Sequence, residues 1–134
     1  NMFKTSLDLI KKIVKIKNKK ILILGVSYKE DIYDLRLSPS MNLVKGLMKY
    51  TRKVFLYDPF LEINNNSKFL NKIPAFKNFD IIIFSNAHEQ IKNISFKQFE
   101  KKAYYFDLNN VLSYKMINRF RDNKIKLKVL GDKK

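Results

Sequence analysis

Three short segments made only of apolar and aromatic residues constrain the fold of this chain more than any other feature. They are residues 21–24, 54–57 and 81–84. A strand that is apolar at every position is buried on both faces, as in the parallel sheets of α/β proteins. Residues 103–106 have the same character, whereas residues 124–130 alternate between lysine and aliphatic side chains. The alternating segment is typical of a half-buried strand, and its lysines suit the edge of a sheet.

Segments with helical patterns lie between the predicted strands. Residues 111–121 carry apolar side chains at intervals of four, which is one face of a helix. Ser38-Pro39 predicts the start of another helix, because serine suits the N-cap and proline suits the first helical position. A short helix capped by its serine is expected over residues 95–101. Residues 60–79 are expected to be irregular.

Strands that alternate with helices predict an α/β protein. We expect a Rossmann-like three-layer fold with a mainly parallel sheet of about five strands. The chain has 134 residues, of which 46% are hydrophobic, enough for one domain with its own core. No apolar run approaches the roughly 18–20 residues that cross a membrane, so no membrane-spanning segment is expected.

Residues 2–17 are predicted to form an amphipathic helix. Phe3, Leu7, Ile10 and Val14 fall on one face, and lysines occupy much of the rest. A basic amphipathic helix can lie on a membrane surface or bind a calmodulin-type partner. Packing of the apolar face against a neighbouring element is the more common arrangement, and it is the one we favour.

The absence of cysteine limits the chemistry available to the chain. It excludes disulfide bonds, thiolate metal sites and a cysteine nucleophile within these residues. A reducing, cytoplasmic location is compatible with this composition.

The net charge of +16, from 28 basic and 12 acidic residues, creates a field that attracts anions. A bias toward lysine, asparagine and isoleucine throughout the sequence explains much of this charge. Two alternatives are a basic nucleic-acid-binding module and an assembly or interaction domain. Nucleic acid is the less favoured partner, because the lysines are spread along the chain and no nucleic-acid-binding motif is present.

The segment 25–39 follows the first predicted strand and carries the main candidate binding residues. Tyr28 can lay its ring against a base or a sugar, and Lys29 offers a positive charge to a phosphate or carboxylate. Arg36 can form two parallel hydrogen bonds with a phosphate. A structural interpretation stays open beside this one, in which Arg36 pairs with Asp34 and Tyr28 belongs to the core.

The sequence lacks the glycine-rich fingerprint of a dinucleotide site. Gly25, Ser27 and Glu30 stand where three glycines would let the backbone approach a pyrophosphate. Asp58 lies near the position of a ribose-binding acid, but a turn that ends the second strand is the favoured interpretation. His88, the only histidine, is expected to be a hydrogen-bonded turn residue, and no catalytic triad or metal cluster is indicated.

Residues 25–39 read GVSYKEDIYDLRLSP. This segment resembles the signature G-x-x-(Phe/Tyr)-K-x-D-x-x-D-x-R-x-S-P, which opens the C-terminal, UDP-binding domain of the UDP-glucose/GDP-mannose dehydrogenases. Tyr57-Asp58-Pro59 and the segment 86–88 also resemble motifs of that family. The similarity runs from about residue 19 to about residue 130.

The resemblance implies a domain division and a set of site residues. Residues 19–134 would form the UDP-sugar-binding domain, and residues 1–18 would be the end of a preceding helical segment. Tyr28 and Lys29 would contact the nucleotide sugar. Arg36 would reach toward an NAD cofactor held mainly by an upstream catalytic domain, and a homodimer is a possible assembly.

The implied activity is the NAD-dependent oxidation of the C6 alcohol of a UDP-sugar to a uronate, a reaction of polysaccharide biosynthesis. In the family this chemistry passes through a thioester on a cysteine of the upstream domain, so the isolated chain is expected to be inactive. One position departs from the family pattern. Asn109 stands where an arginine usually contacts the nucleotide sugar, and the loss of one charge-assisted hydrogen bond costs about 1.5–3 kcal/mol.

Overall fold

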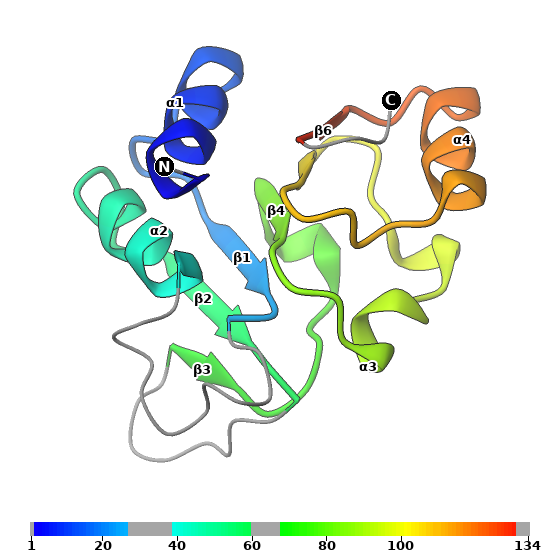
Figure 1. Ribbon diagram of the computed structural model, residues 1–134, viewed down its shortest axis with the longest axis horizontal. Coiled ribbons are helices and arrows are strands. Elements are labelled where there is room, and N and C mark those ends of the chain that lie inside the picture. The colour runs from blue at the N-terminus through cyan, green and yellow to red at the C-terminus, as the bar shows by residue number, and fades with distance from the viewer. Residues whose placement is uncertain (1, 27–38, 60–67, 131–134) are drawn as a thin grey trace.

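The computed structural model describes residues 2–26, 39–59 and 68–130. These residues form one six-stranded sheet in the order β3-β2-β1-β4-β5-β6, with every neighbouring pair of strands parallel (Figure 1). The strands are β1 (Ile21–Leu24), β2 (Val54–Tyr57), β3 (Phe69–Leu70), β4 (Ile81–Phe84), β5 (Tyr104–Asp107) and β6 (Leu127–Val129). This is the doubly wound order of Rossmann folds. The predicted fold class is confirmed.

Helices cover both faces of the sheet. They are α1 (Met2–Ile13), α2 (Pro39–Leu47), α3 (Glu89–Lys92) and α4 (Tyr114–Asp122), with two 3-10 turns, η3 (Phe76–Asn78) and η4 (Phe96–Gln98). Figure 1 shows α1 and α2 side by side on one side of the molecule, and α3 and α4 on the other. A hydrophobic core lies on each face of the sheet, because successive side chains of a strand point to opposite faces. In β1, Ile21 and Ile23 pack toward α1 and α2, while Leu22 and Leu24 belong to the core on the other face.

The N-terminal helix packs on the domain through its apolar face. Ile10 is fully buried, and Val14 and Ile16 join the same core as Leu43 and Leu47 of α2. Packing was the favoured interpretation of residues 2–17, although α1 itself ends at Ile13. Within the described ranges, no helix combines the length and apolar character that a membrane crossing requires.

The sheet has six strands rather than five because residues 60–79 include a short strand. Leu56 and Tyr57 of β2 pair with Phe69 and Leu70, and the Leu56 amide donates to the carbonyl of Lys68 at 2.8 Å. A strand of two residues is too short to give a periodic pattern, so the sequence could not indicate it.

Two helix boundaries also differ from the predictions. The segment 95–101 contains only the 3-10 turn η4, whose cap is the predicted serine, Ser95. Helix α4 begins at Tyr114 rather than at residue 111. The amides of Val111 and Leu112 each donate to the carboxylate of Asp107 at 2.9 Å, so these residues belong to the loop after β5.

An aromatic cluster fills the core between the sheet and α4. Phe99 and Phe120 have ring centroids 4.7 Å apart, and Tyr105 lies 5.1 Å from Phe120. The Tyr105 hydroxyl accepts from the Glu100 amide at 2.6 Å and donates to the Glu100 carbonyl at 2.9 Å. Burial raises the pKa of the Tyr105 phenol far above its ordinary value, so the ring stays neutral in this core.

Candidate functional site

The candidate site lies at the carboxyl ends of β1 and β4, the two central strands. After β1 the chain leads to α2 on one face of the sheet, and after β4 it leads to α3 on the other (Figure 1). Such a reversal opens a crevice beyond the strand ends, where open α/β sheets bind their ligands. The residues that follow each strand therefore decide what this crevice can hold.

Gly25 shapes the turn that follows β1. Its φ angle is +85°, in the left-handed region, and a Cβ atom there would lie 2.6 Å from the carbonyl oxygen of Asn86. Only glycine can occupy this position without strain. The segment that follows β4 fills the space on that side of Gly25, so the turn after β1 packs directly against it.

A buried carboxylate holds the next residue in place. Asp58 Oδ2 accepts from the Val26 amide at 2.8 Å and lies 3.4 Å from His88 Nε2. The Asp58 side chain is fully buried and the His88 side chain is 7% exposed. Asp58 thus connects the ends of β1 and β2 to the turn after β4. This agrees with the favoured interpretation of Asp58 as part of a turn.

His88 is a turn residue, as the sequence suggested. It occupies the N-cap of α3, and its amide donates to the Asn86 carbonyl at 3.2 Å. Its contact with Asp58 was not predicted, because nothing in the local sequence relates the two residues. Among the residues that the structure describes, no group of histidine and acidic side chains could hold a metal ion.

A serine pair connects α2 to the end of β4. The Oγ atoms of Ser40 and Ser85 share a short hydrogen bond, and both residues are buried. The first turn of α2 is therefore fixed beside the crevice. A helix N-terminus carries free amides and a partial positive charge, which favours anionic ligands.

Asp107 organises the loop that follows β5. It is fully buried, and its carboxylate accepts from the amides of Asn109 at 3.2 Å and of Val111 and Leu112 at 2.9 Å. Asn109 is half-buried in this loop. This role of Asp107 was not predicted. The sequence feature that could have indicated it is an acidic residue at the end of a buried strand. Asp58, at the end of β2, is a second residue of this kind.

The predicted binding residues Tyr28, Lys29 and Arg36 lie outside the described residues, as does Asp34, the alternative partner of Arg36. The structure describes the two ends of their segment, Val26 and the start of α2. Both ends are held at the carboxyl edge of the sheet.

Residues 22–114 match the model of the UDP-glucose/GDP-mannose dehydrogenase family, UDP binding domain. The chain is 30% identical to the UDP-N-acetyl-D-glucosamine 6-dehydrogenase of Salmonella typhi over 112 residues, covering 78% of this chain and 26% of that protein. It is 29% identical to the UDP-N-acetyl-D-mannosamine dehydrogenase of Methanococcus aeolicus, covering 87% of this chain and 27% of that protein. The chain thus spans about a quarter of the length of these curated relatives.

A solved structure supports the fold. The UDP-N-acetyl-mannosamine dehydrogenase Cap5O of Staphylococcus aureus superposes with a TM-score of 0.62 at 24% identity, covering 83% of this chain and 27% of that chain. The family model covers residues 22–24 of β1 and all of β2, β4 and β5, together with every described residue of the crevice. The chain belongs to the UDP-glucose/GDP-mannose dehydrogenase family and corresponds to its UDP-binding domain.

Proposed function

We propose that this chain binds the UDP part of a nucleotide sugar at the carboxyl edge of its sheet. The observation that carries the proposal is the family match over residues 22–114, which begins in β1 and includes the whole crevice. The fixed turn at Gly25 and Val26 and the anchored N-terminus of α2 support it, because they hold both ends of the segment with the candidate binding residues.

The names of the relatives support UDP more than any one sugar. They include dehydrogenases of UDP-glucose, UDP-N-acetyl-D-glucosamine and UDP-N-acetyl-D-mannosamine. UDP is common to these names, whereas the sugar differs. In this proposal Tyr28 packs against the uridine or the sugar, and Lys29 pairs with a negatively charged group of the ligand.

The proposed whole protein is an NAD-dependent UDP-sugar 6-dehydrogenase of polysaccharide biosynthesis. Residues 19–134 would be its nucleotide-sugar domain, and residues 1–18 would end the helical segment before it. An upstream domain would hold NAD and supply the catalytic cysteine, with Arg36 reaching toward the cofactor. A homodimer and a cytoplasmic location belong to the same proposal.

Calorimetric titration with UDP tests the binding role. Lys29→Ala is expected to weaken UDP binding by roughly tenfold to a hundredfold, since a hydrogen bond with a charged group contributes about 1.5–3 kcal/mol. Lys101→Ala is a matched control, because Lys101 is exposed and precedes β5, at the amino edge of the sheet. Equal UDP affinity for Lys29→Ala and the parent chain, with both folded, would contradict the role of Lys29.

A further inference from the structure

A second candidate site lies at the opposite edge of the sheet, beside the amino ends of β1 and β2. A surface pocket of about 490 Å³ is lined there by Asn18, Met48, Lys49, Tyr50, Thr51, Arg52 and Lys53. This volume falls within the range of about 300–1,000 Å³ that is usual for small-molecule sites. Strands of four residues separate this edge from the carboxyl-edge crevice by roughly 13 Å.

The loops that form this pocket are held together by hydrogen bonds. Thr51 is buried, and its hydroxyl donates to the Lys19 carbonyl at 2.8 Å and accepts from the Lys53 amide at 3.2 Å. The amides of Asn18 and Ile21 donate across the loops to the carbonyls of Tyr50 and Lys53. The pocket walls are therefore fixed by the backbone.

The pocket is lined by positively charged side chains that form no ion pair within the described part of the chain. Lys49, Arg52 and Lys53 line it, and no acidic residue does. All three side chains are exposed, and none forms an ion pair with another described residue. Cations held close together repel one another, so an anion that binds between them relieves this repulsion.

These cations are not needed as hydrogen-bond partners for the carbonyl groups at the C-terminal end of α2. The amides of Tyr50 and Thr51 already donate to the carbonyl of Leu47, and the Met48 amide donates to the carbonyl of Val44. The last turn of the helix is therefore closed by the backbone. This leaves the charged groups of Lys49, Arg52 and Lys53 available to a ligand.

The same pocket exposes apolar surface next to the cations. Met48 is 47% exposed and Tyr50 is 38% exposed, although both have large hydrophobic side chains. The ammonium group of Lys11 lies 5.0 Å from the centroid of the Tyr50 ring. An aromatic ring and a thioether beside an arginine provide a stacking surface and a phosphate partner together.

We propose that this pocket binds a phosphorylated ligand that carries a planar ring, of the nucleotide class. Arg52 would pair with the phosphate through its guanidinium fork, and Lys49 and Lys53 would add charge around it. Tyr50 and Met48 would contact the ring. The ligand could be a free mononucleotide or one unit of a single-stranded nucleic acid, since both present the same phosphate and base.

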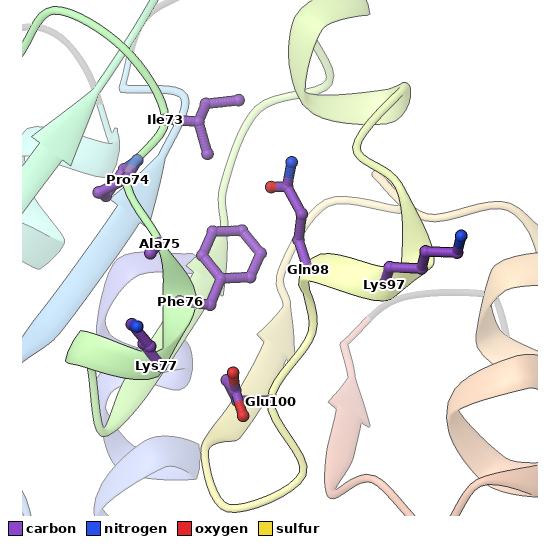
Figure 2. A pocket seen from close by; sticks show the side chains of 8 residues that line it. All are labelled: Ile73, Pro74, Ala75, Phe76, Lys77, Lys97, Gln98 and Glu100. Atoms are coloured by element: carbon purple, nitrogen blue, oxygen red, sulfur yellow. The ribbon is translucent and has the colours of Figure 1, made fainter.

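Another surface pocket is less selective in its charge. It measures about 370 Å³ and lies between η3 and η4, with Lys77, Lys97, Gln98 and Glu100 around Ile73, Pro74, Ala75 and Phe76 (Figure 2). Lysines and an acid share this lining, so its charge does not select one class of ligand.

The test is a ¹H–¹⁵N NMR titration of the chain with AMP alone, in which the amides near each site report on that site separately. The amides of Asn18 and of residues 48–53 are expected to shift, while those of Gly25 and Asn86 stay unchanged. The triple variant Lys49→Gln, Arg52→Gln, Lys53→Gln is expected to bind AMP at least about tenfold more weakly. The matched control Lys92→Gln, Lys101→Gln, Lys115→Gln removes the same charge from exposed positions outside the pocket and should keep the parent affinity.

Two further probes test the ring and identify the source of the ligand. Tyr50→Leu should weaken AMP binding by about fivefold or more and leave the binding of inorganic phosphate unchanged. A (dT)₆ oligonucleotide that shifts the same amides and binds more tightly than TMP would assign the site to single-stranded nucleic acid, and the reverse order to a mononucleotide. The proposal is overturned if no shift is localised at residues 48–53, if both triple variants lose affinity equally, or if phosphate binds as tightly as AMP.

Discussion

His88 Nε2 lies 3.4 Å from Asp58 Oδ2, and the same carboxylate oxygen accepts from the Val26 amide at 2.8 Å. One buried atom thus joins the end of β1, the end of β2 and the turn after β4. These three segments border the crevice at the carboxyl edge of the sheet. The position of the chain as it enters residues 27–38 therefore depends on a side chain from a different strand.

Loss of the Asp58 carboxylate should destabilise the fold. Asp58→Ala leaves the Val26 amide without this acceptor, and an unsatisfied buried donor costs about 1–3 kcal/mol. Asp58→Asn keeps a carbonyl oxygen for Val26 and should lose less. Urea denaturation measures both, with Asp122→Ala as the control, because that side chain is 68% exposed. Asp58→Ala with the stability of the parent chain would contradict the role assigned to this carboxylate.

The Tyr105 hydroxyl should make the free energy of unfolding of the chain fall at high pH. Burial raises the pKa of Tyr105 above its ordinary value of 10.0. Below about pH 10 both the folded and the unfolded phenol are neutral, and each of the two hydrogen bonds with Glu100 stabilises the fold by about 0.5–1.5 kcal/mol. Above that pH the unfolded phenol loses its proton while the folded one keeps it, so the free energy of unfolding falls.

Thermal unfolding of Tyr105→Phe and the parent chain tests this relationship. The parent should be the more stable protein near pH 8, and its advantage should shrink as the pH rises above about 10. The raised pKa of Tyr57 affects both proteins equally and cancels in the difference. Tyr114→Phe, at a position 60% exposed, should show little effect. A constant difference between Tyr105→Phe and the parent across this pH range would be the opposing result.

Lys124→Gly should stabilise the chain. Lys124 has a φ angle of +58° and follows the last residues of α4. Its amide donates to the Arg121 carbonyl at 3.0 Å, and the Ile125 amide donates to the Phe120 carbonyl at 2.9 Å. This is the Schellman arrangement, in which glycine is preferred at the left-handed position.

The expected gain is about 1 kcal/mol, which is the usual strain of a side chain in that conformation. Differential scanning calorimetry should therefore show a higher melting temperature for Lys124→Gly. Lys115→Gly removes the same side chain within α4 and should lower the melting temperature, because glycine is unfavourable inside a helix. A lower melting temperature for Lys124→Gly as well would argue against this backbone geometry.

Asn109→Arg tests whether the departure from the family pattern affects binding. Because the carboxylate of Asp107 bonds to the backbone amide of Asn109, the substitution leaves that contact intact. If the proposed UDP-sugar site is correct, arginine should strengthen binding by roughly tenfold or more through a charge-assisted hydrogen bond. The control is Asn78→Arg, at an exposed position of η3 near the amino end of β4, which should bind as the parent does.

The central strands were predictable because burial on both faces leaves a clear pattern. The bounds of β1, β2 and β4 agree with the apolar segments 21–24, 54–57 and 81–84. Strand β3 was not predicted because a strand of two residues is too short to show a periodic pattern of apolar side chains. The predicted start of α4 was wrong because the amides of Val111 and Leu112 donate to the carboxylate of Asp107. These two residues therefore lie in the loop, although their apolar side chains continue the helical pattern.

The candidate site was predictable in position but not in its internal contacts. Gly25 and the strand that precedes it indicated the carboxyl edge. The contact between Asp58 and His88 depends on the parallel packing of β1 between β2 and β4, which brings distant segments together. A linear sequence does not contain that proximity. The roles of Tyr28, Lys29 and Arg36 remain predictions from the family resemblance.

The most direct test of the nucleotide-binding proposal is a thermal-shift titration of the chain with UDP, UDP-glucose, UDP-N-acetylhexosamines and inorganic phosphate at two salt concentrations. A ligand at about 100 times its Kd adds about 2.7 kcal/mol of stability, which raises the melting temperature by several degrees. We expect such a rise with the UDP compounds at both salt concentrations, in the parent chain and in the triple variant Lys49→Gln, Arg52→Gln, Lys53→Gln alike, and a smaller rise with phosphate. No rise with any UDP compound, for the parent chain and for Asn109→Arg alike, would contradict a nucleotide site in this domain.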